Sequence, residues 1–311
     1  MSVEIDITRY ARELGFAAVG ILPAAPSQTT DVLQRWLDSG FDAGMTYMRR
    51  HVDLRADPRR LVPEARSLVV AAARYPANPR PGYGISTYAR GRDYHDVLRQ
   101  KLHALGTMVR EAAGARIGRV CVDSAPLLER EWALRAGIGV RGRQGQVVAP
   151  HLGSCLLLGE LLVDVPLPTH RSPPLPPGGT NVHPCRNCRL CVDACPTGAL
   201  RDNGLVDAGK CISYLTIEHE GEIPPDLRGK LGEALFGCDL CTAVCPLNHA
   251  GEHLVMPELA DLGVPTADAC AAMSDEDFSR RFRGSAVSRG GAARLRRNAS
   301  IAIKNRAAGR K

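Results

Sequence analysis

The sequence predicts an α+β fold that is followed by a smaller, cysteine-rich domain. Segments with helical and with strand periodicity alternate over residues 1–165. Eight of the eleven cysteines fall between residues 181 and 255. Between these parts, residues 166–180 (PLPTHRSPPLPPGGT) are too rich in proline for a helix or a central strand. We therefore expect an α+β domain at 1–165, a crossover at 166–180, a cluster domain at 181–255 and a basic helical tail at 256–311.

The first domain shows seven elements in order. Residues 67–73 (SLVVAAA) form an apolar run that is typical of a buried strand, and residues 94–112 place Val97, Leu98 and Leu102 on one helical face. Pro126 suits the first turn of the helix expected at 127–136. The predicted helices cover 3–14, 94–112 and 127–136, and the predicted strands cover 17–22, 67–73, 119–122 and 156–163.

The chain has 311 residues and a formal net charge of +7. No stretch reaches the roughly 18 apolar residues that a membrane helix needs, and Met1–Tyr10 lacks a basic region followed by an apolar run. We therefore expect a soluble, cytoplasmic protein without membrane contact. Because that compartment is reducing, disulfides are not expected, and the spacing of the cysteines decides their role.

Two cysteine runs predict iron–sulfur clusters. The first, Cys185-Arg-Asn-Cys188-Arg-Leu-Cys191-Val-Asp-Ala-Cys195-Pro, has the spacing C-x2-C-x2-C-x3-C-P of bacterial ferredoxins. The second, Cys238-Asp-Leu-Cys241-Thr-Ala-Val-Cys245-Pro, is one cysteine shorter, and Cys211 upstream can supply the missing thiolate. Eight thiolates are enough for two [4Fe–4S] clusters, so the sequence predicts a redox protein.

In two-cluster ferredoxins the cysteine before proline binds the other cluster. This crossing assigns one cluster to Cys185, Cys188, Cys191 and Cys245, and the other to Cys195, Cys211, Cys238 and Cys241. The alternative is a pair of zinc sites, but three successive cysteines in a run that ends in Cys-Pro fit zinc poorly. The remaining Cys121, Cys155 and Cys270 are expected to be small buried residues.

A glycine motif at Gly137-Ile-Gly139-Val-Arg-Gly142 matches the pattern G-x-G-x-x-G. A dinucleotide site needs this motif between a strand and a helix. Here the preceding residues 131–136 are predicted to be helical, so we interpret these glycines as loop residues.

About 165 residues precede the clusters, which favours an enzyme whose clusters feed a reaction site over a ferredoxin-like electron carrier. Several motifs resemble those of the epoxyqueuosine reductases, which are cobalamin-dependent iron–sulfur enzymes of tRNA modification. They are Tyr47-Met-Arg-Arg, Arg55-Ala-Asp-Pro, Tyr88-Ala-Arg-Gly-Arg-Asp93-Tyr-His95, Cys121-Val-Asp123-Ser-Ala-Pro-Leu-Leu-Glu129-Arg, Cys211-Ile-Ser-Tyr-Leu-Thr-Ile-Glu-His219 and Gly237-Cys-Asp-Leu-Cys.

This resemblance implies a nitroreductase-like cobalamin-binding domain joined to a ferredoxin-like domain, in a monomer. It implies that the enzyme converts epoxyqueuosine to queuosine at the tRNA wobble position. Base-off cobalamin, two clusters and an external low-potential electron donor would take part. A cobalamin and iron–sulfur reductase with another substrate, as in the reductive dehalogenases, is the alternative.

The resemblance implies that Asp123 is the proton donor, which requires a carboxyl group that stays protonated near neutral pH. From the residues alone, Asp123 could instead be the N-cap of the following helix. By resemblance, the residues that line the corrin are Arg55, Ser86, Asp93, His95, Asp123, Ser213, His219 and Asp239. The motif D-x-H-x-x-G of histidine-ligated cobalamin is incomplete, because Leu98 stands where glycine should be.

The sequence departs from the family pattern in three places. Where the family has an aromatic residue and then Gly-Lys-Asn, this chain has Val-Arg-Gly142-Arg143-Gln144, so arginine stands in place of lysine. Leu247 replaces tryptophan after the last cysteine run, and the C-terminal helical repeats are expected to be missing. The basic tail could contact tRNA phosphates or could be a solvated terminus. Its cations are Arg294, Arg296, Arg297, Lys304, Arg306, Arg310 and Lys311.

Overall fold

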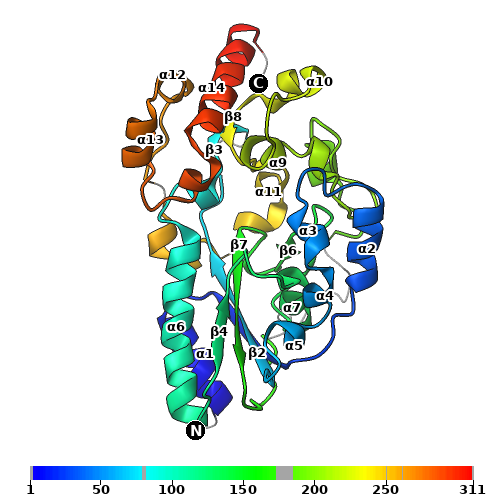
Figure 1. Ribbon diagram of the computed structural model, residues 1–311, viewed down its shortest axis with the longest axis vertical. Helices are drawn as coiled ribbons and strands as arrows, with labels where there is room; N and C mark the ends of the chain where they lie inside the picture. The colour runs from blue at the N-terminus through cyan, green and yellow to red at the C-terminus, as the bar shows by residue number, and fades with distance from the viewer. Residues whose placement is uncertain (1–2, 79–81, 173–184, 250, 261, 310–311) are drawn as a thin grey trace.

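The computed structural model describes residues 3–78, 82–172, 185–249, 251–260 and 262–309. Its centre is a four-stranded antiparallel sheet in the order β1-β2-β7-β4 (Figure 1). The strands are β1 (Ala18–Pro23), β2 (Ser67–Arg74), β7 (Leu156–Val163) and β4 (Gly118–Cys121). The four predicted strands therefore lie within about one residue of the observed ones.

The central strand β2 is buried along its whole length and packs on both faces. Val69, Ala71 and Ala73 face one apolar cluster, whereas Leu68 and Val70 face the other. This alternation follows from the period of two in a strand. A continuous apolar run was therefore the correct signal for a strand that is covered on both sides.

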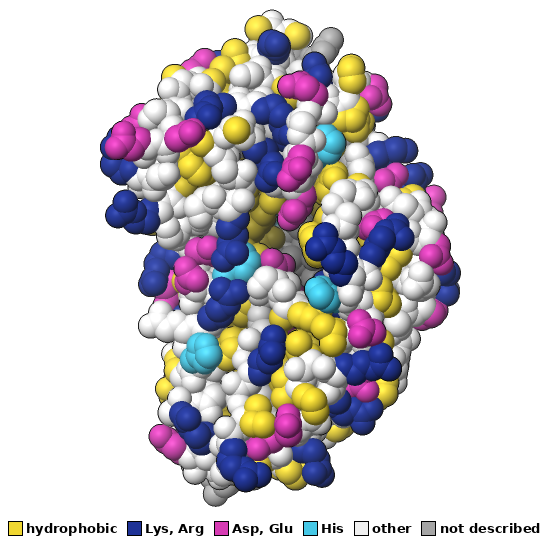
Figure 2. All heavy atoms as spheres, viewed as in Figure 1, with side chains coloured by type: hydrophobic (Ala, Val, Ile, Leu, Met, Phe, Trp, Pro, Cys, Tyr) yellow, Lys and Arg dark blue, Asp and Glu magenta, His cyan; other side chains and the backbone are white. Residues whose placement is uncertain are grey.

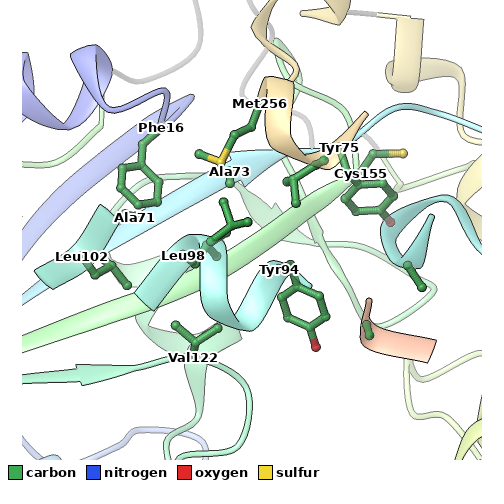
Figure 3. Packing of buried hydrophobic residues seen from close by; sticks show 14 of the residues in the cluster. Phe16, Ala71, Ala73, Tyr75, Tyr94, Leu98, Leu102, Val122, Cys155 and Met256 are labelled. Carbon is green, nitrogen blue, oxygen red and sulfur yellow. The ribbon is translucent and has the colours of Figure 1, made fainter. Parts of the chain in front are cut away.

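Helices form the outer layers of this sandwich. α1 (Val3–Glu13) and α6 (Tyr94–Ala113) cover one face, and α7 (Glu129–Arg135) contacts the other. Figure 3 shows Leu98 and Leu102 of α6 near Ala71, Ala73 and Met256 in the first cluster. The remaining helices of this half are α2 (Thr30–Asp38), α3 (Tyr47–Arg50), α4 (Val52–Ala56) and α5 (Pro58–Leu61).

The prediction for Pro126 was wrong, because α7 begins later than expected. Its N-cap is Leu128, so Pro126 precedes the helix. Two tight turns, Ser124 N–H to Val122 O at 2.6 Å and Leu127 N–H to Ala125 O at 2.8 Å, occupy the segment before it. The glycine motif starts no helix either, since β5 (Val140–Arg141) pairs with β6 (Val147–Val148) in a hairpin.

The cysteine-rich part is joined to the first part through a second, parallel sheet. β3 (Tyr83–Ile85) pairs with β8 (Glu233–Phe236). The short helices of this part are α8 (Leu190–Asp193), α9 (Ile212–Ile217), α10 (Pro225–Arg228) and α11 (Leu240–Ala243). Of the predicted crossover, residues 173–180 lie outside the described residues.

The C-terminal helices cover this second sheet. α12 (Ala267–Ala271), α13 (Asp275–Arg281) and α14 (Ala292–Ala307) follow the clusters, and α14 packs on β8 and α12 (Figure 1). Leu295, Ala299 and Ala302 are buried, so α14 is part of the fold and not a solvated terminus. Among the described helices, none combines the length and apolar character that crossing a membrane requires.

Asn298 ties α14 to the cluster domain. Its buried side-chain amide donates to Thr216 O at 2.9 Å and to Leu235 O at 2.8 Å. We expect Asn298→Ala to lower the free energy of unfolding by about 2–4 kcal/mol, because two buried carbonyls lose their donor. Ser300→Ala, which removes an exposed hydroxyl that donates to Arg296 O on the same helix, should stay within about 0.5 kcal/mol. Anaerobic urea titrations of both variants check this, and equal effects would contradict it.

Candidate active site

Asp123 stands directly after β4 in a conformation that is unusual for its residue type. Its φ is +55°, in the left-handed region that residues other than glycine rarely adopt. Because Leu128 is the N-cap of α7, Asp123 does not cap that helix. The Asp123 backbone N–H donates to Glu129 Oε1 at 2.6 Å, and this bond holds the turn. The side chain is 59% exposed, so it is open to a ligand.

His95 connects Asp123 to a second carboxylate. Its Nε2 lies 3.0 Å from Asp123 Oδ2, and its Nδ1 lies 2.7 Å from Asp93 Oδ1. Asp93 is the N-cap of α6 and accepts the His95 backbone N–H at 3.0 Å, which fixes both residues at the start of a long helix. Arg289 Nε lies 3.2 Å from Asp93 Oδ2. The four side chains Arg289, Asp93, His95 and Asp123 thus form a row of charged or titratable groups.

The charges in this row are strongly coupled. Burial lowers the pKa of His95, but its hydrogen bonds to Asp123 and Asp93 outweigh burial and raise the pKa above the ordinary value. Desolvation by the surrounding protein raises the pKa of Asp123, but the hydrogen bond and charge of His95, together with Tyr94 and Arg289, outweigh it and lower the pKa. The sequence-based requirement for a protonated Asp123 is therefore not met. These two directions favour the form in which His95 carries the proton and donates it to the Asp123 carboxylate.

Two acidic side chains lie behind Asp123. Glu160 is fully buried on β7, facing the same side of the sheet as α7, and its register partner on β4 is Cys121. Burial, together with Glu129, raises the pKa of Glu160 well above its ordinary value. Burial, together with Asp123, likewise raises the pKa of Glu129. The neutral form is therefore favoured in this pair, whereas Asp123 is favoured as the anion.

Arg55 and Tyr47 complete the surroundings of Asp123. Arg55 is only 7% exposed, and its Nε has no hydrogen-bond partner among the described residues. Burial, with Glu218 and Asp123 nearby, raises the pKa of Tyr47 to about 12. The site thus lies between the α3–α4 segment and the end of α9. Figure 2 shows this face hollowed near its centre, with Lys or Arg and His side chains around the hollow.

The other residues predicted to line the corrin fall into two kinds. Ser86 donates to Asp239, and Asp239 also accepts from Asn78 Nδ2 at 2.6 Å and from the Thr87 backbone N–H at 2.9 Å. Ser86 and Asp239 are therefore buried partners of each other. Ser213 and His219 are half-buried on and just after α9, and His219 Nε2 lies 3.1 Å from Glu222 O.

The seven cysteines of the two runs and Cys211 fall into two sets, and Tyr88 is electrostatically coupled both to Cys211 and to Asp123. Electrostatic coupling joins the Cys191 and Cys245 thiols to those of Cys185 and Cys188. It also joins the Cys238 thiol to those of Cys211 and Cys195. The Cys241 thiol couples to this second set and to Cys191 of the first, so the two sets are neighbours. None of the eleven cysteines forms a disulfide.

These thiols fit a polynuclear cluster. Burial raises the pKa of Cys238 to about 12 and that of Cys241 well above its usual range, so bound iron would have to supply the charge that favours the thiolates. In a cubane each iron takes one cysteine, so the four ligands do not converge on one point. Within the described ranges, no group of three or more His, Cys, Asp or Glu side chains forms a site for a metal ion.

A close approach of backbones holds the second run against the first domain. Gly237 has φ +74°, and a Cβ there would stand 2.6 Å from the Cβ of Ser86. Only glycine fits such a position without displacement. Cys238, a predicted cluster ligand, therefore follows a residue that packs directly on the segment before α6.

The arginines of the C-terminal segment are engaged within the protein. Arg297 donates to the carbonyls of Leu215, His219 and Gly221 at 2.6–2.9 Å. The others contact Ile217 (Arg294), Met273 and Asp275 (Arg296), and Asp268 (Arg306). These contacts give the arginines a structural role in α14, and Arg310 and Lys311 lie outside the described residues.

Four residues of the site were missing from the sequence-based set. Tyr47 and Glu129 belong to the motifs that carry the resemblance, but the sequence alone predicted no role for either residue. An acidic residue in the apolar run 156–163 was a usable signal for Glu160. Arg289 lies 196 residues from its partner Asp93 and gave no local signal.

Comparison with known proteins gives matches along nearly the whole chain. The family model "Epoxyqueuosine reductase QueG, DUF1730" matches residues 55–124, and "4Fe-4S double cluster binding domain" matches residues 184–248. The chain is 39% identical to the epoxyqueuosine reductase of Escherichia coli (strain K12), over 98% of this chain and 83% of that one. It is 38% identical to that of Cyclobacterium marinum, over 91% of each chain.

Solved structures agree with these matches. A crystal structure of epoxyqueuosine reductase with a tRNA-Tyr epoxyqueuosine-modified stem loop superposes with a TM-score of 0.86 at 31% identity, covering 97% of this chain and 81% of that one. The Bacillus subtilis enzyme with its aspartate-bearing catalytic loop swung out of the active site gives 0.82 at 31% identity, with 97% and 81% covered.

The fold and the double-cluster domain define an iron–sulfur oxidoreductase. Within that class, the chain belongs to the epoxyqueuosine reductase family. The predicted family, the enzyme class and the fold class, α+β with a two-cluster domain, are thereby confirmed.

Proposed function

We propose that this chain reduces epoxyqueuosine to queuosine at the tRNA wobble position. The observation that carries the proposal is the row Asp93–His95–Asp123, which aims a proton at an exposed carboxylate beside two sets of four thiols. Conversion of an epoxide to an alkene consumes two electrons and two protons and releases the oxygen as water. The site therefore needs an electron store and a proton donor in one place.

The electron store is two [4Fe–4S] clusters with crossed ligands. Cys185, Cys188, Cys191 and Cys245 hold one cluster, and Cys195, Cys211, Cys238 and Cys241 hold the other. The coupling of the thiols within these sets supports the assignment. When bound, the clusters would supply electrons one at a time, taken from an external low-potential donor.

Cobalamin, bound base-off, is the second cofactor of the proposal, and when bound it supplies a strongly reducing centre. The unpartnered Nε of buried Arg55 is a donor that an acceptor group on such a cofactor would satisfy. Ser213 and His219 are the other candidates for direct contact. The remaining candidates act indirectly. The hydrogen bond between Ser86 and Asp239 fixes both side chains, and Asp93 orients the ring of His95.

Asp123 passes a proton from its hydrogen-bonded partner His95 to the substrate. Asp93 holds the imidazole by its Nδ1 atom, so that Nε2 faces Asp123. Tyr94 also donates to the Asp123 carboxylate and stacks on the His95 ring at 4.0 Å. These contacts orient the carboxylate toward a substrate oxygen that acquires negative charge, and protonation there makes it a better leaving group.

The rate of conversion should depend on pH through His95. Because the hydrogen bonds to both carboxylates raise the pKa of His95, the proton is held below that raised pKa and is lost as pH rises through it. We expect the rate to fall with increasing pH, and His95→Gln to lose this fall. Single-turnover rates across pH measure it, and an identical alkaline limb in both proteins would contradict it.

An assay of the reconstituted chain tests the proposed function. The protein, loaded anaerobically with clusters, is given an anticodon stem loop that carries epoxyqueuosine, with and without cobalamin, and queuosine is measured by mass spectrometry. Conversion that requires cobalamin supports the proposal. Tight cobalamin binding without conversion would leave a reductase with another substrate, and no cobalamin binding would leave an iron–sulfur electron carrier.

A further inference from the structure

Arg143 joins the first domain to the loop that carries the first three cysteines. Its Nε donates to Cys188 O at 3.0 Å, and its Nη2 donates to Cys185 O at 3.0 Å and to Arg186 O at 3.2 Å. Its Nη1 donates to Asp202 O at 3.3 Å. One side chain thus binds four backbone carbonyls, and two of them belong to cysteines of one predicted cluster.

The side chain is held on a rigid support. Arg143 lies in the turn between β5 and β6, which is closed by the bond from Gly142 N–H to Gln146 O at 2.7 Å. Arg130 donates to Gly145 O at 2.8 Å and fastens the same turn to α7. The α7 helix also carries Glu129, which holds the turn at Asp123. The hairpin therefore links the cysteine loop to the turn that bears the acid.

The charge of Arg143 is not neutralised locally. Among the residues that the structure describes, no carboxylate forms an ion pair with it, and its partners are all neutral carbonyls. A cluster gains one negative charge on reduction, so a fixed cation beside its loop stabilises the reduced form. A planar guanidinium can bind several carbonyls at once, which an ammonium group does less well.

We propose that Arg143 is a positioning residue of the cluster bound by Cys185, Cys188, Cys191 and Cys245, fixing its loop and raising its reduction potential. The inference rests on the proposed function for the presence of the cluster. It goes beyond that function by giving one of the two clusters a higher potential through a residue of the first domain. The site of the arginine is one at which this sequence departs from the family pattern.

Three variants test the proposal, each reconstituted anaerobically as the full chain. Arg143→Met removes the charge and the donors, and Arg143→Lys keeps the charge but not the planar set of donors. Arg141→Met is the matched control, because Arg141 lies two positions away and donates to Gly204 O at 3.0 Å. The readouts are iron content and the two cluster midpoints, followed by electron paramagnetic resonance during a redox titration.

The expected result is a lower midpoint for one cluster in Arg143→Met, by at least a tenfold change in its reduction equilibrium, about 59 mV for one electron. The other cluster is the internal reference and should not move. Arg143→Lys should show a smaller shift, and Arg141→Met none. If Arg143→Met loses the cluster, the midpoint of Arg143→Gln decides, because glutamine removes the charge but keeps an amide donor.

Unchanged midpoints in Arg143→Met or, where that variant has lost the cluster, in Arg143→Gln, would overturn the proposal. An equal shift in Arg141→Met would overturn it as well, because any surface charge would then suffice. A wild-type chain that takes up no cluster would instead contradict the proposed function, so the two failures are distinguishable.

Discussion

Replacing Asp123 by asparagine is expected to slow queuosine formation by about 10²–10⁴-fold, because the amide cannot carry a proton to the substrate oxygen. The substitution keeps the size of the side chain and leaves the Asp123 backbone N–H bonded to Glu129. Since 59% of the Asp123 side chain is exposed, no buried charge is lost and the protein should remain folded. Single-turnover mass spectrometry of the stem loop measures the rate.

Asp96→Asn is the matched control for this experiment. Asp96 lies in the first turn of α6, one residue after His95, and its side chain is 67% exposed beside Arg99. The control should keep the wild-type rate and the wild-type cluster content. Full activity in Asp123→Asn, with both clusters present, would remove the proton-donor role.

Replacing Cys245 by alanine is expected to remove one cluster and to abolish turnover. Cys245 is the fourth ligand of the Cys185 set in the crossed arrangement, so iron content should fall to about half. Loss of this cluster would remove one of the two electron carriers between the external donor and the reaction site. Cys270→Ala is the control, since Cys270 is buried in α12 away from the thiol sets and should retain full iron.

Double variants separate crossed from uncrossed ligation. In the crossed arrangement, Cys245→Ala with Cys188→Ala damages one cluster only and keeps about half of the iron. Cys245→Ala with Cys241→Ala damages both clusters and loses nearly all of it. The reverse pattern of iron content would show that each run binds its own cluster.

The sequence predicted correctly those helices and strands that are determined by neighbouring residues in the chain. Residues 67–73 form a strand because every side chain from Leu68 to Ala73 is apolar, and α6 begins where Asp93 can cap it. The iron–sulfur clusters could likewise be predicted, because the diagnostic cysteine spacing extends over only a few residues. By contrast, Ser86 meets Asp239 across 153 positions, and Arg289 meets Asp93 across 196. Such contacts depend on the packing of α14 and β8, which no local pattern describes.

The protonation state of Asp123 also depends on a residue that is distant in the sequence, so it could not be predicted from local patterns. A carboxyl group after an apolar strand was expected to be protonated by burial. The structure brings His95 to it from α6, 28 residues earlier, and that hydrogen bond lowers the pKa of Asp123. The functional unit is therefore the pair, whose two members come from different layers of the fold.

The most direct test of the account is the stoichiometry of one turnover without an external reductant. The chain is loaded with clusters and cobalamin, reduced, freed of excess reductant and mixed with surplus epoxyqueuosine stem loop. The two clusters, at one electron each, together with the reduced cobalamin would cover the two electrons of about one queuosine per chain. A yield from the fully loaded wild-type protein no higher than from protein without clusters would contradict the account.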